Sequence, residues 1–333
     1  MRYRKLGVTG LVVSEIGFGG WGIGGALDEA HSYGITDDQE SLRALQRAFE
    51  LGVTLYDTSN LYGNGHSETL IGKAFQKVRP RVVLASKGGF FIDGEQDFSP
   101  RHLRESLEGS LERLQTDYLD LFQLHSPASI LLPRLGETLK ALEDLKREGK
   151  IRAFGISVRS PDDGLVAARE LHAPFLQINF SMIDQRAREN GLLDLCAQSQ
   201  VGFIARTPLC YGFLTGRYTS ETVFPPKDHR SKWPRQQIAL WASSPKLFAS
   251  VLRDPQSNPA QVALRYCLST PGISAVIPGM LTIQQVEENV PASDQGPLLE
   301  EELREIEKVY QENTFFIEEK GRETLSGTVG SKP

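Results

Sequence analysis

Short apolar runs recur along the chain, and each is followed by a longer segment whose apolar residues have helical spacing. The runs show little alternation of polar and apolar residues, which is typical of strands that a parallel sheet buries on both faces. In residues 38–51, Leu42, Leu45 and Phe49 fall on one helical stripe that ends at Gly52. The eight runs are residues 13–19, 53–58, 82–86, 118–124, 153–158, 175–180, 202–207 and 274–278.

Eight strand and helix units favour one closed barrel over an open sheet. Eight is the number that closes a (β/α)8 TIM barrel, an α/β fold, whereas an open doubly wound sheet usually has fewer strands and a phosphate-binding glycine pattern after its first one. Residues 2–13 turn around Val8-Thr9-Gly10 and predict an N-terminal β-hairpin that precedes the main fold. We expect a single domain over residues 1–325 and a disordered tail over the small, polar residues 326–333.

One region breaks this rhythm after the seventh run. Residues 218–254 contain the pieces Phe224-Pro225-Pro226 and Trp233-Pro234, which predict a long inserted loop with some helix. Long loops of a barrel that follow its strands border the active site, so we expect this insertion to lie over the site.

Composition and charge narrow the class of partner. The 333 residues carry a formal net charge of -5, which favours neither nucleic acid nor an anionic membrane, so a small-molecule partner is expected. The three cysteines stand far apart without a C-x-x-C pair, which argues against a disulfide framework and a thiolate metal site. No secretory signal or run of about 18 apolar residues is found, so we expect a cytoplasmic protein without a membrane span. No heptad run stands out, which favours a monomer.

Ionisable and phenolic groups follow three of the predicted strands. Asp57 ends the second run and Tyr62 lies in the loop behind it, Lys87 follows the third run, and His125 follows the fourth. Because the carboxyl ends of barrel strands meet at one mouth, the four side chains should converge there. Taken singly, each has an ordinary structural role as a cap, a packing ring or a structural histidine. Lys87 differs, since a lysine directly behind an apolar strand needs a carboxylate, and Asp57 on the adjacent strand can supply it.

The four groups suit hydride transfer to a carbonyl. The carbonyl oxygen must be protonated or polarised as negative charge develops on it. A tyrosine has a pKa of about 10, and a neighbouring lysine cation makes it a better acid by stabilising the phenolate. His125 could hydrogen-bond the same oxygen. A metal-dependent hydrolase is the rival interpretation, but the six histidines form no cluster with metal-ligand spacing, so no metal is expected.

On these residues the chain resembles the aldo-keto reductase superfamily over almost its whole length. The matching pieces are Ile16-Gly17-Phe18-Gly19-Gly20-Trp21, Tyr56-Asp57-Thr58-Ser59, Tyr62-Gly63, Ala85-Ser86-Lys87-Gly88, Asp117-Tyr118-Leu119-Asp120-Leu121, Leu124-His125, Gly155-Ile156-Ser157 and Glu288-Asn289. The resemblance implies a (β/α)8 barrel closed at its base by the hairpin. It also implies that Tyr62, assisted by Lys87, Asp57 and His125, is the acid for carbonyl reduction and the base for alcohol oxidation.

The resemblance further implies a nicotinamide cofactor that lies extended across the barrel mouth, without a Rossmann fold. The implied contacts are Gly20 and Trp21 by backbone, Ser157 and Gln177 on the carboxamide, Arg206 on the nicotinamide or pyrophosphate, Thr207, Leu209 and Tyr211 around the pyrophosphate, and Glu288 and Asn289 on the adenine. Three residues depart from the family at the 2′-phosphate: Gly279, Met280 and Gln285 stand where many NADPH-specific members have Lys, Ser and Arg. NADPH is expected from the family as a whole, and use of NADH stays possible.

Two functions fit this site. The leading one is reversible hydride transfer between NAD(P)H and a small aldehyde, ketone or sugar, which makes the chain an oxidoreductase. The alternative is a redox-sensing regulatory subunit that holds NADPH tightly and turns over slowly. Both would keep the same four residues, so the sequence alone does not separate them.

Overall fold

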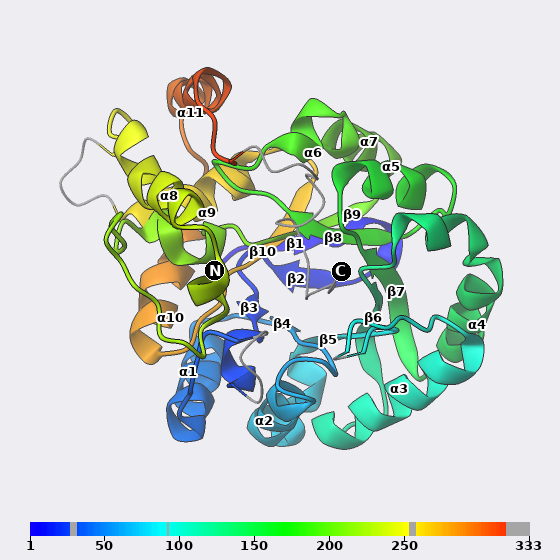
Figure 1. Cartoon of the computed structure of the whole chain (residues 1–333). Coiled ribbons are helices and arrows are strands. Elements are labelled where there is room, and N and C mark those ends of the chain that lie inside the picture. Colours follow the sequence, from blue (N-terminus) through cyan, green and yellow to red (C-terminus); the bar gives the residue numbers. More distant parts are fainter. Residues whose placement is uncertain (27–31, 92, 253–257, 318–333) are drawn as a thin grey trace.

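An eight-stranded parallel sheet forms the centre of the molecule (Figure 1). The computed structural model describes residues 1–26, 32–91, 93–252 and 258–317. Each strand pairs with the next one along the chain, in the order β10-β9-β8-β7-β6-β5-β4-β3. The strands are β3 (Phe18–Gly19), β4 (Leu55–Asp57), β5 (Val83–Gly88), β6 (Leu119–His125), β7 (Ile151–Ser157), β8 (Phe175–Asn179), β9 (Gly202–Arg206) and β10 (Ile273–Ile277).

The two ends of the sheet meet, so the barrel is nearly closed. Isolated parallel bridges join Ile16 to Val276 and Gly19 to Gly279. The amide of Gly19 donates to the carbonyl of Pro278 at 2.9 Å. A Cβ on Gly19 would lie 2.8 Å from the carbonyl oxygen of Ile277, so glycine is what permits this close approach. The predicted (β/α)8 barrel is confirmed.

Helices surround the sheet and bury one face each (Figure 1). In the first, Asp37 caps the helix by accepting from the amide of Glu40, and the predicted stripe buries Leu45 with Ala44 and Ala48. The helices are α1 (Asp38–Glu50), α2 (His66–Phe75), α3 (Pro100–Leu114), α4 (Gly136–Arg147), α5 (Pro161–Arg169), α6 (Arg186–Glu189), α7 (Leu192–Ser199), α8 (Arg235–Leu247), α9 (Pro259–Ser269), α10 (Ile283–Asn289) and α11 (Glu300–Glu312). In the described ranges no helix is both long and apolar enough to cross a membrane.

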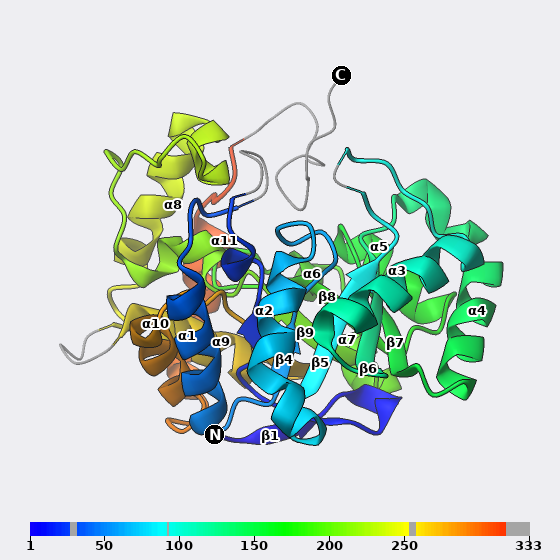
Figure 2. The ribbon, with the colours of Figure 1, turned by 90° about the horizontal axis from the view of Figure 1, so that it is seen from below.

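The predicted hairpin lies across the lower end of the barrel (Figure 2). It pairs β1 (Tyr3–Lys5) with β2 (Val12–Ser14) in antiparallel register. The prediction of one strand over residues 13–19 was wrong, because that run divides between β2 and β3. The hydroxyl of Ser14 donates to the carbonyl of Ile16 at 2.7 Å and accepts from the amide of Thr54 at 3.0 Å, which bends the chain between the two strands.

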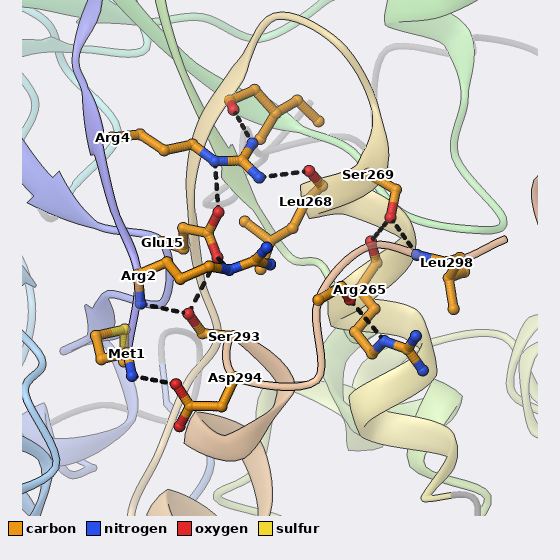
Figure 3. Close-up of polar contacts among 12 residues, drawn as sticks. Met1, Arg2, Arg4, Glu15, Arg265, Leu268, Ser269, Ser293, Asp294 and Leu298 are labelled. Carbon is orange, nitrogen blue, oxygen red and sulfur yellow. Dashed lines mark hydrogen bonds and ion pairs between the residues drawn. The ribbon is translucent and has the colours of Figure 1, made fainter.

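A buried carboxylate ties the hairpin to the rest of the barrel (Figure 3). Glu15 is 2% exposed and accepts from Arg2 Nε at 3.1 Å, Arg4 Nε at 2.6 Å and Ser293 Oγ at 3.0 Å. The guanidinium of Arg4 also donates to the carbonyls of Ile273 and Leu268, both at 2.8 Å. We call Arg2, Arg4, Glu15 and Ser293 the base seam, since they join the hairpin to the start of β10 and to the segment behind α10.

The insertion lies at the opposite end from the hairpin, where α8 stands near the top of Figure 2. The described part of this insertion, residues 218–252, holds a loop and the 13-residue helix α8, in line with the predicted loop with some helix. Trp241 of this helix is buried. Residues 326–333, predicted to be a disordered tail, lie outside the described residues, and the single-domain assignment remains a prediction.

Candidate active site

The four predicted catalytic residues meet at the carboxyl ends of neighbouring strands. Asp57 is the last residue of β4, Lys87 lies in β5, His125 ends β6, and Tyr62 lies in the loop between β4 and α2. Lys87 Nζ is 2.5 Å from Asp57 Oδ1 and 3.1 Å from the hydroxyl of Tyr62. The rings of Tyr62 and His125 meet edge to face at a centroid distance of 6.1 Å. The strand assignments therefore brought together groups that are up to 68 positions apart in sequence, from Asp57 to His125.

The ammonium of Lys87 uses all three of its donors in this cluster. Besides Asp57 and Tyr62 it donates to the carbonyl of Thr58 at 2.9 Å, and its side chain is fully buried. Burial alone lowers the pKa of Lys87, but the Asp57 carboxylate and the Tyr62 oxygen outweigh it, so this pKa lies above its ordinary value. Lys87 is therefore a cation. Because the Tyr62 oxygen accepts from Lys87, the hydroxyl proton of Tyr62 is left to point at another acceptor.

Two glutamine amides hold the other carboxylate oxygen of Asp57. Gln123 Nε2 donates to Oδ2 at 3.0 Å and Gln177 Nε2 donates to the same atom at 2.7 Å. Gln177 was predicted to hold a cofactor carboxamide; this bond uses one of its two N–H donors and leaves the second N–H and the Oε1 oxygen for a ligand. Gln123 was missed by the sequence analysis. Its signal was a polar residue two positions before His125 in an apolar strand, which places both side chains on one face.

His125 is a neutral imidazole in this site. Burial, helped by the positive charges of Lys87 and Arg206, holds the pKa of His125 well below its usual range. Its Nδ1 lies 3.1 Å from Ser59 Oγ, and this hydroxyl also accepts from the amide of Leu61 at 3.2 Å. A neutral ring can orient an oxygen through a hydrogen bond without competing as the proton source.

A cavity of about 380 Å³ opens beside these groups, within the range of small-molecule sites. Asp57, Tyr62 and His125 line it, whereas Lys87 lies behind its wall. Every residue predicted to contact the cofactor except Ser157 also lines it; those residues are Gly20, Trp21, Gln177, Arg206, Thr207, Leu209, Tyr211, Gly279, Gln285, Glu288 and Asn289. Ser157 stands behind Arg206, whose Nη1 donates to its hydroxyl at 3.3 Å.

Arg206 is a cation without a neutralising carboxylate in the described part of the chain. Its Nη2 donates to the carbonyl of Val158 at 3.0 Å, and its buried Nε has no hydrogen-bond partner. Burial lowers the pKa of Arg206, although the nearby Tyr211 and Tyr62 oxygens act in the opposite direction. A half-buried guanidinium without a carboxylate partner, on a cavity wall, fits a ligand that brings negative charge or a flat ring, and a nicotinamide dinucleotide offers both.

The loop behind β9 holds an unusual backbone. Thr207, Cys210 and Tyr211 have φ of 52°, 44° and 55°, a left-handed conformation that costs non-glycine residues roughly 1–2 kcal/mol each. Arg230 Nη1 donates to the carbonyl of Tyr211 at 2.9 Å and helps to hold this shape. Such strain is concentrated at ligand sites, and here it shapes one wall of the cavity.

The far end of the cavity carries a cation that the sequence analysis missed. Arg217 lines the cavity and forms an ion pair with Glu288. Gln285 uses its Oε1 to accept from the amide of Leu281 at 2.7 Å, and a Cβ on Gly279 would meet nothing within 4 Å. The charge near Glu288 thus comes from the loop behind β9, not from the segment behind β10 where the family pattern led us to look.

Metal ligands do not gather in this site. Among residues 1–26, 32–91, 93–252 and 258–317, no group of three or more His, Cys, Asp or Glu side chains could hold a metal ion. The positive charge next to Tyr62 and His125 comes from the side chains of Lys87 and Arg206.

Comparison with known proteins identifies relatives over nearly the full chain. The model of the aldo/keto reductase family matches residues 15–311. The uncharacterized oxidoreductase YqkF of Bacillus subtilis is 32% identical over 324 residues, covering 95% of this chain and 98% of that protein. The holo form of aldo-keto reductase AKR11C1 from Bacillus halodurans is 30% identical with a TM-score of 0.75, covering 96% of this chain and 99% of that one. An aldo/keto reductase from Klebsiella pneumoniae in complex with NADP and acetate is 28% identical with a TM-score of 0.70, covering 93% and 96%.

Proposed function

The chain belongs to the aldo/keto reductase family and is an NAD(P)H-dependent oxidoreductase, and from this premise we propose that it reduces a small aldehyde, ketone or sugar with Tyr62 as proton donor. One observation carries the assignment of Tyr62. The buried Lys87 ammonium donates to both the Asp57 carboxylate and the Tyr62 oxygen at the cavity wall. This contact stabilises negative charge on the Tyr62 oxygen as its proton leaves.

Each of the four residues Asp57, Tyr62, Lys87 and His125 has a different part in proton transfer. Tyr62 donates its hydroxyl proton to the substrate oxygen during reduction and takes a proton from the alcohol during oxidation. Lys87 stays charged and stabilises the phenolate, while Asp57 fixes the position of the ammonium. His125, neutral and lining the same cavity, donates or accepts a hydrogen bond that orients the substrate oxygen beside Tyr62.

A nicotinamide cofactor, when bound, supplies or accepts the hydride. Around the reactive end we assign Gln177 and Arg206, which both line the cavity. The residues assigned to the rest of the dinucleotide are Gly20, Trp21, Ser157, Thr207, Leu209, Tyr211, Gly279, Gln285, Glu288 and Asn289. Arg206 and Ser157 act together, since the hydroxyl of Ser157 holds the guanidinium.

We propose NADPH as the preferred cofactor. Gly279 and Gln285 bring no positive charge to the cavity, but Arg217 does, and it lies beside Glu288. An arginine that binds a phosphate dianion through charge-assisted hydrogen bonds favours the phosphorylated cofactor. Competing NADPH against NADH by equilibrium binding tests this preference: Arg217→Met should weaken NADPH and leave NADH within a few fold, and tighter binding of NADH by the unaltered protein would contradict it.

The proposed role of Tyr62 has a direct test. Tyr62→Phe removes only the hydroxyl, so turnover should fall by roughly 1,000-fold, within the usual range for a general acid, while the Kd for NADPH stays unchanged. An equal loss of cofactor binding would contradict the role. Counting turnovers with excess carbonyl substrate separates an enzyme from a redox sensor, because a sensor stops after one slow oxidation of its bound NADPH.

A further inference from the structure

Two chemically identical groups hold the same oxygen of Asp57, but only one of them can reach a ligand. Gln177 lines the cavity, whereas Gln123 is fully buried and does not contribute to the cavity wall. The strand register explains the difference. Gln123 pairs with Lys87 across β5 and β6, two residues below His125, so it lies one layer deeper in the barrel.

The orientation of the Gln123 amide is fixed by chemistry. A carboxylate only accepts hydrogen bonds, so the amide nitrogen must face Asp57 Oδ2, where it lies at 3.0 Å. The amide oxygen is then turned away, and within the described residues this buried Oε1 has no hydrogen-bond partner. A buried acceptor without a partner lowers stability, and an apolar side chain of similar size would avoid that loss. The one contact that distinguishes Gln123 from such a side chain is its donation to Asp57.

The hydrogen bond from Gln123 affects the charges of Asp57 and Lys87. With Gln123 and Gln177 on Oδ2, the oxygen Oδ1 is left to Lys87 alone, at 2.5 Å. The N–H dipoles also stabilise Asp57 as an anion and add positive potential next to Lys87 and Tyr62. Without them the carboxylate would be a stronger base and would draw the ammonium away from the Tyr62 oxygen.

We propose that Gln123 is a positioning residue of the reaction, which acts on Tyr62 through Asp57 and Lys87 without touching substrate or cofactor. The proposal rests on the proposed function, because it assigns Gln123 a role in the proton transfer that Tyr62 performs. A positioning role and a structural role predict different results. If Gln123 is a positioning residue, the loss of kcat depends on whether the side chain at position 123 can donate a hydrogen bond to Asp57, and not on whether it fills the space.

Two substitutions separate these roles. Gln123→Met fills the space without a donor and should lower kcat about 10-fold at every pH, at the low end of effects on proton transfer. Gln123→Glu keeps the size of the side chain, and its new carboxyl donates to Asp57 only while it is protonated. Two carboxyl groups in contact share a proton with a raised pKa, so kcat of this variant should be close to that of the unaltered protein at about pH 6 and fall at least roughly 10-fold by about pH 8.

The titratable and charged groups around this carboxyl pair are Asp57 from β4, Tyr62 from the following loop, Lys87 from β5, His125 from β6 and Arg206 from β9. All five are unchanged in both variants, so a pH limb that is new in Gln123→Glu reports the substituted carboxyl. Gln177→Met is the matched control: it removes a donor from the same oxygen, but it lines the cavity and should weaken cofactor binding as well as kcat.

The readouts are kcat, KM and the equilibrium Kd for NADPH between about pH 6 and 8, with the thermal midpoint as a check on folding. A fall in kcat with unchanged Kd, and the new pH limb in Gln123→Glu, support the proposal. Unaltered kcat in Gln123→Met, or an equal loss in Gln123→Glu at every pH, overturns it. If Gln123→Met does not fold, Gln123→Glu alone decides. Full turnover in Tyr62→Phe would instead overturn the proposed function, whatever the glutamine variants do.

Discussion

The base seam and the cavity wall at the mouth both hold charged side chains, but the hydrogen bonds of these side chains differ. At the base seam Glu15 accepts three hydrogen bonds, and Arg4 divides its donors between that carboxylate and two carbonyls. At the mouth Arg206 keeps an unpaired Nε and Gln123 an unpaired Oε1. Thr207, Cys210 and Tyr211 hold left-handed backbone conformations there as well.

The difference shows which of the two regions stabilises the folded protein. Fully partnered buried charges resist separation, so the seam fixes the hairpin against β10. Unpartnered groups and strained backbone cost free energy in the free protein, and such features are concentrated at functional sites. Substitutions at the seam should therefore change stability without changing chemistry, and substitution of Arg206, which has no carboxylate partner in the described residues, should do the reverse.

The largest effect is expected from Lys87→Met at the mouth. It removes the cation that stabilises charge on the Tyr62 oxygen, so kcat should fall by about 1,000-fold or more. NADPH binding, measured by equilibrium titration, should persist because Lys87 does not line the cavity. Retention of more than a tenth of the activity would show that Tyr62 does not depend on this ammonium.

At the seam, Glu15→Gln should lower the free energy of unfolding by about 2 kcal/mol, because the half-exposed Arg2 and Arg4 lose their shared, buried counter-charge. Urea unfolding measures the loss, and kcat under folding conditions should not change. Asp294→Asn is the matched control, since its side chain is 63% exposed and its pair with the N-terminus should be worth less than about 1 kcal/mol. Equal losses in the two variants would contradict the distinction between them.

Arg206→Met at the mouth should have the opposite sign in the free protein. Replacing a half-buried charge that has no carboxylate partner in the described residues should leave stability unchanged or raise it by about 1 kcal/mol, while NADPH affinity falls at least roughly 10-fold. Unfolding with and without NADPH checks both halves. A loss of stability like that expected for Glu15→Gln would place Arg206 with the seam residues.

The smallest expected effect is a pH dependence of stability at His125. The folded-state pKa of His125 is lowered, chiefly by burial, so below the usual histidine pKa of about 6.5 the unfolded chain binds a proton that the folded protein does not. This contribution to stability is complete above that pH and is lost as the pH falls, by up to about 1.4 kcal/mol per pH unit. His125→Asn should flatten that slope in urea titrations, and the exposed His172→Asn should not.

Much of the barrel, and the grouping of the four candidate catalytic residues, could be predicted from the sequence because both follow from local patterns. Apolar runs mark buried strands, and the rule that strand ends share one mouth placed Asp57, Tyr62, Lys87 and His125 together. The break between β2 and β3 could not be predicted, because the bend depends on the hydrogen bonds of the Ser14 side chain.

Contacts over long separations were equally hidden. The base seam joins Glu15 to Ser293, 278 positions apart, and the pair between Arg217 and Glu288 spans 71 positions. The sequence around each of these four residues does not indicate which distant residue it contacts. Gln123 was hard to predict because its only local signal is one polar residue in an apolar strand. Its role depends on which carboxylate lies beside it in the closed barrel.

One measurement tests the central claim, that the mouth carries out hydride transfer with Tyr62 as the acid. NADPH labelled with deuterium on the transferring face is mixed with a reducible carbonyl, and the alcohol is analysed by mass spectrometry. The account predicts deuterium on the carbinol carbon over many turnovers, with labelled alcohol formed roughly 1,000-fold more slowly by Tyr62→Phe. Unlabelled alcohol, or the same yield of labelled alcohol from Tyr62→Phe, would contradict it.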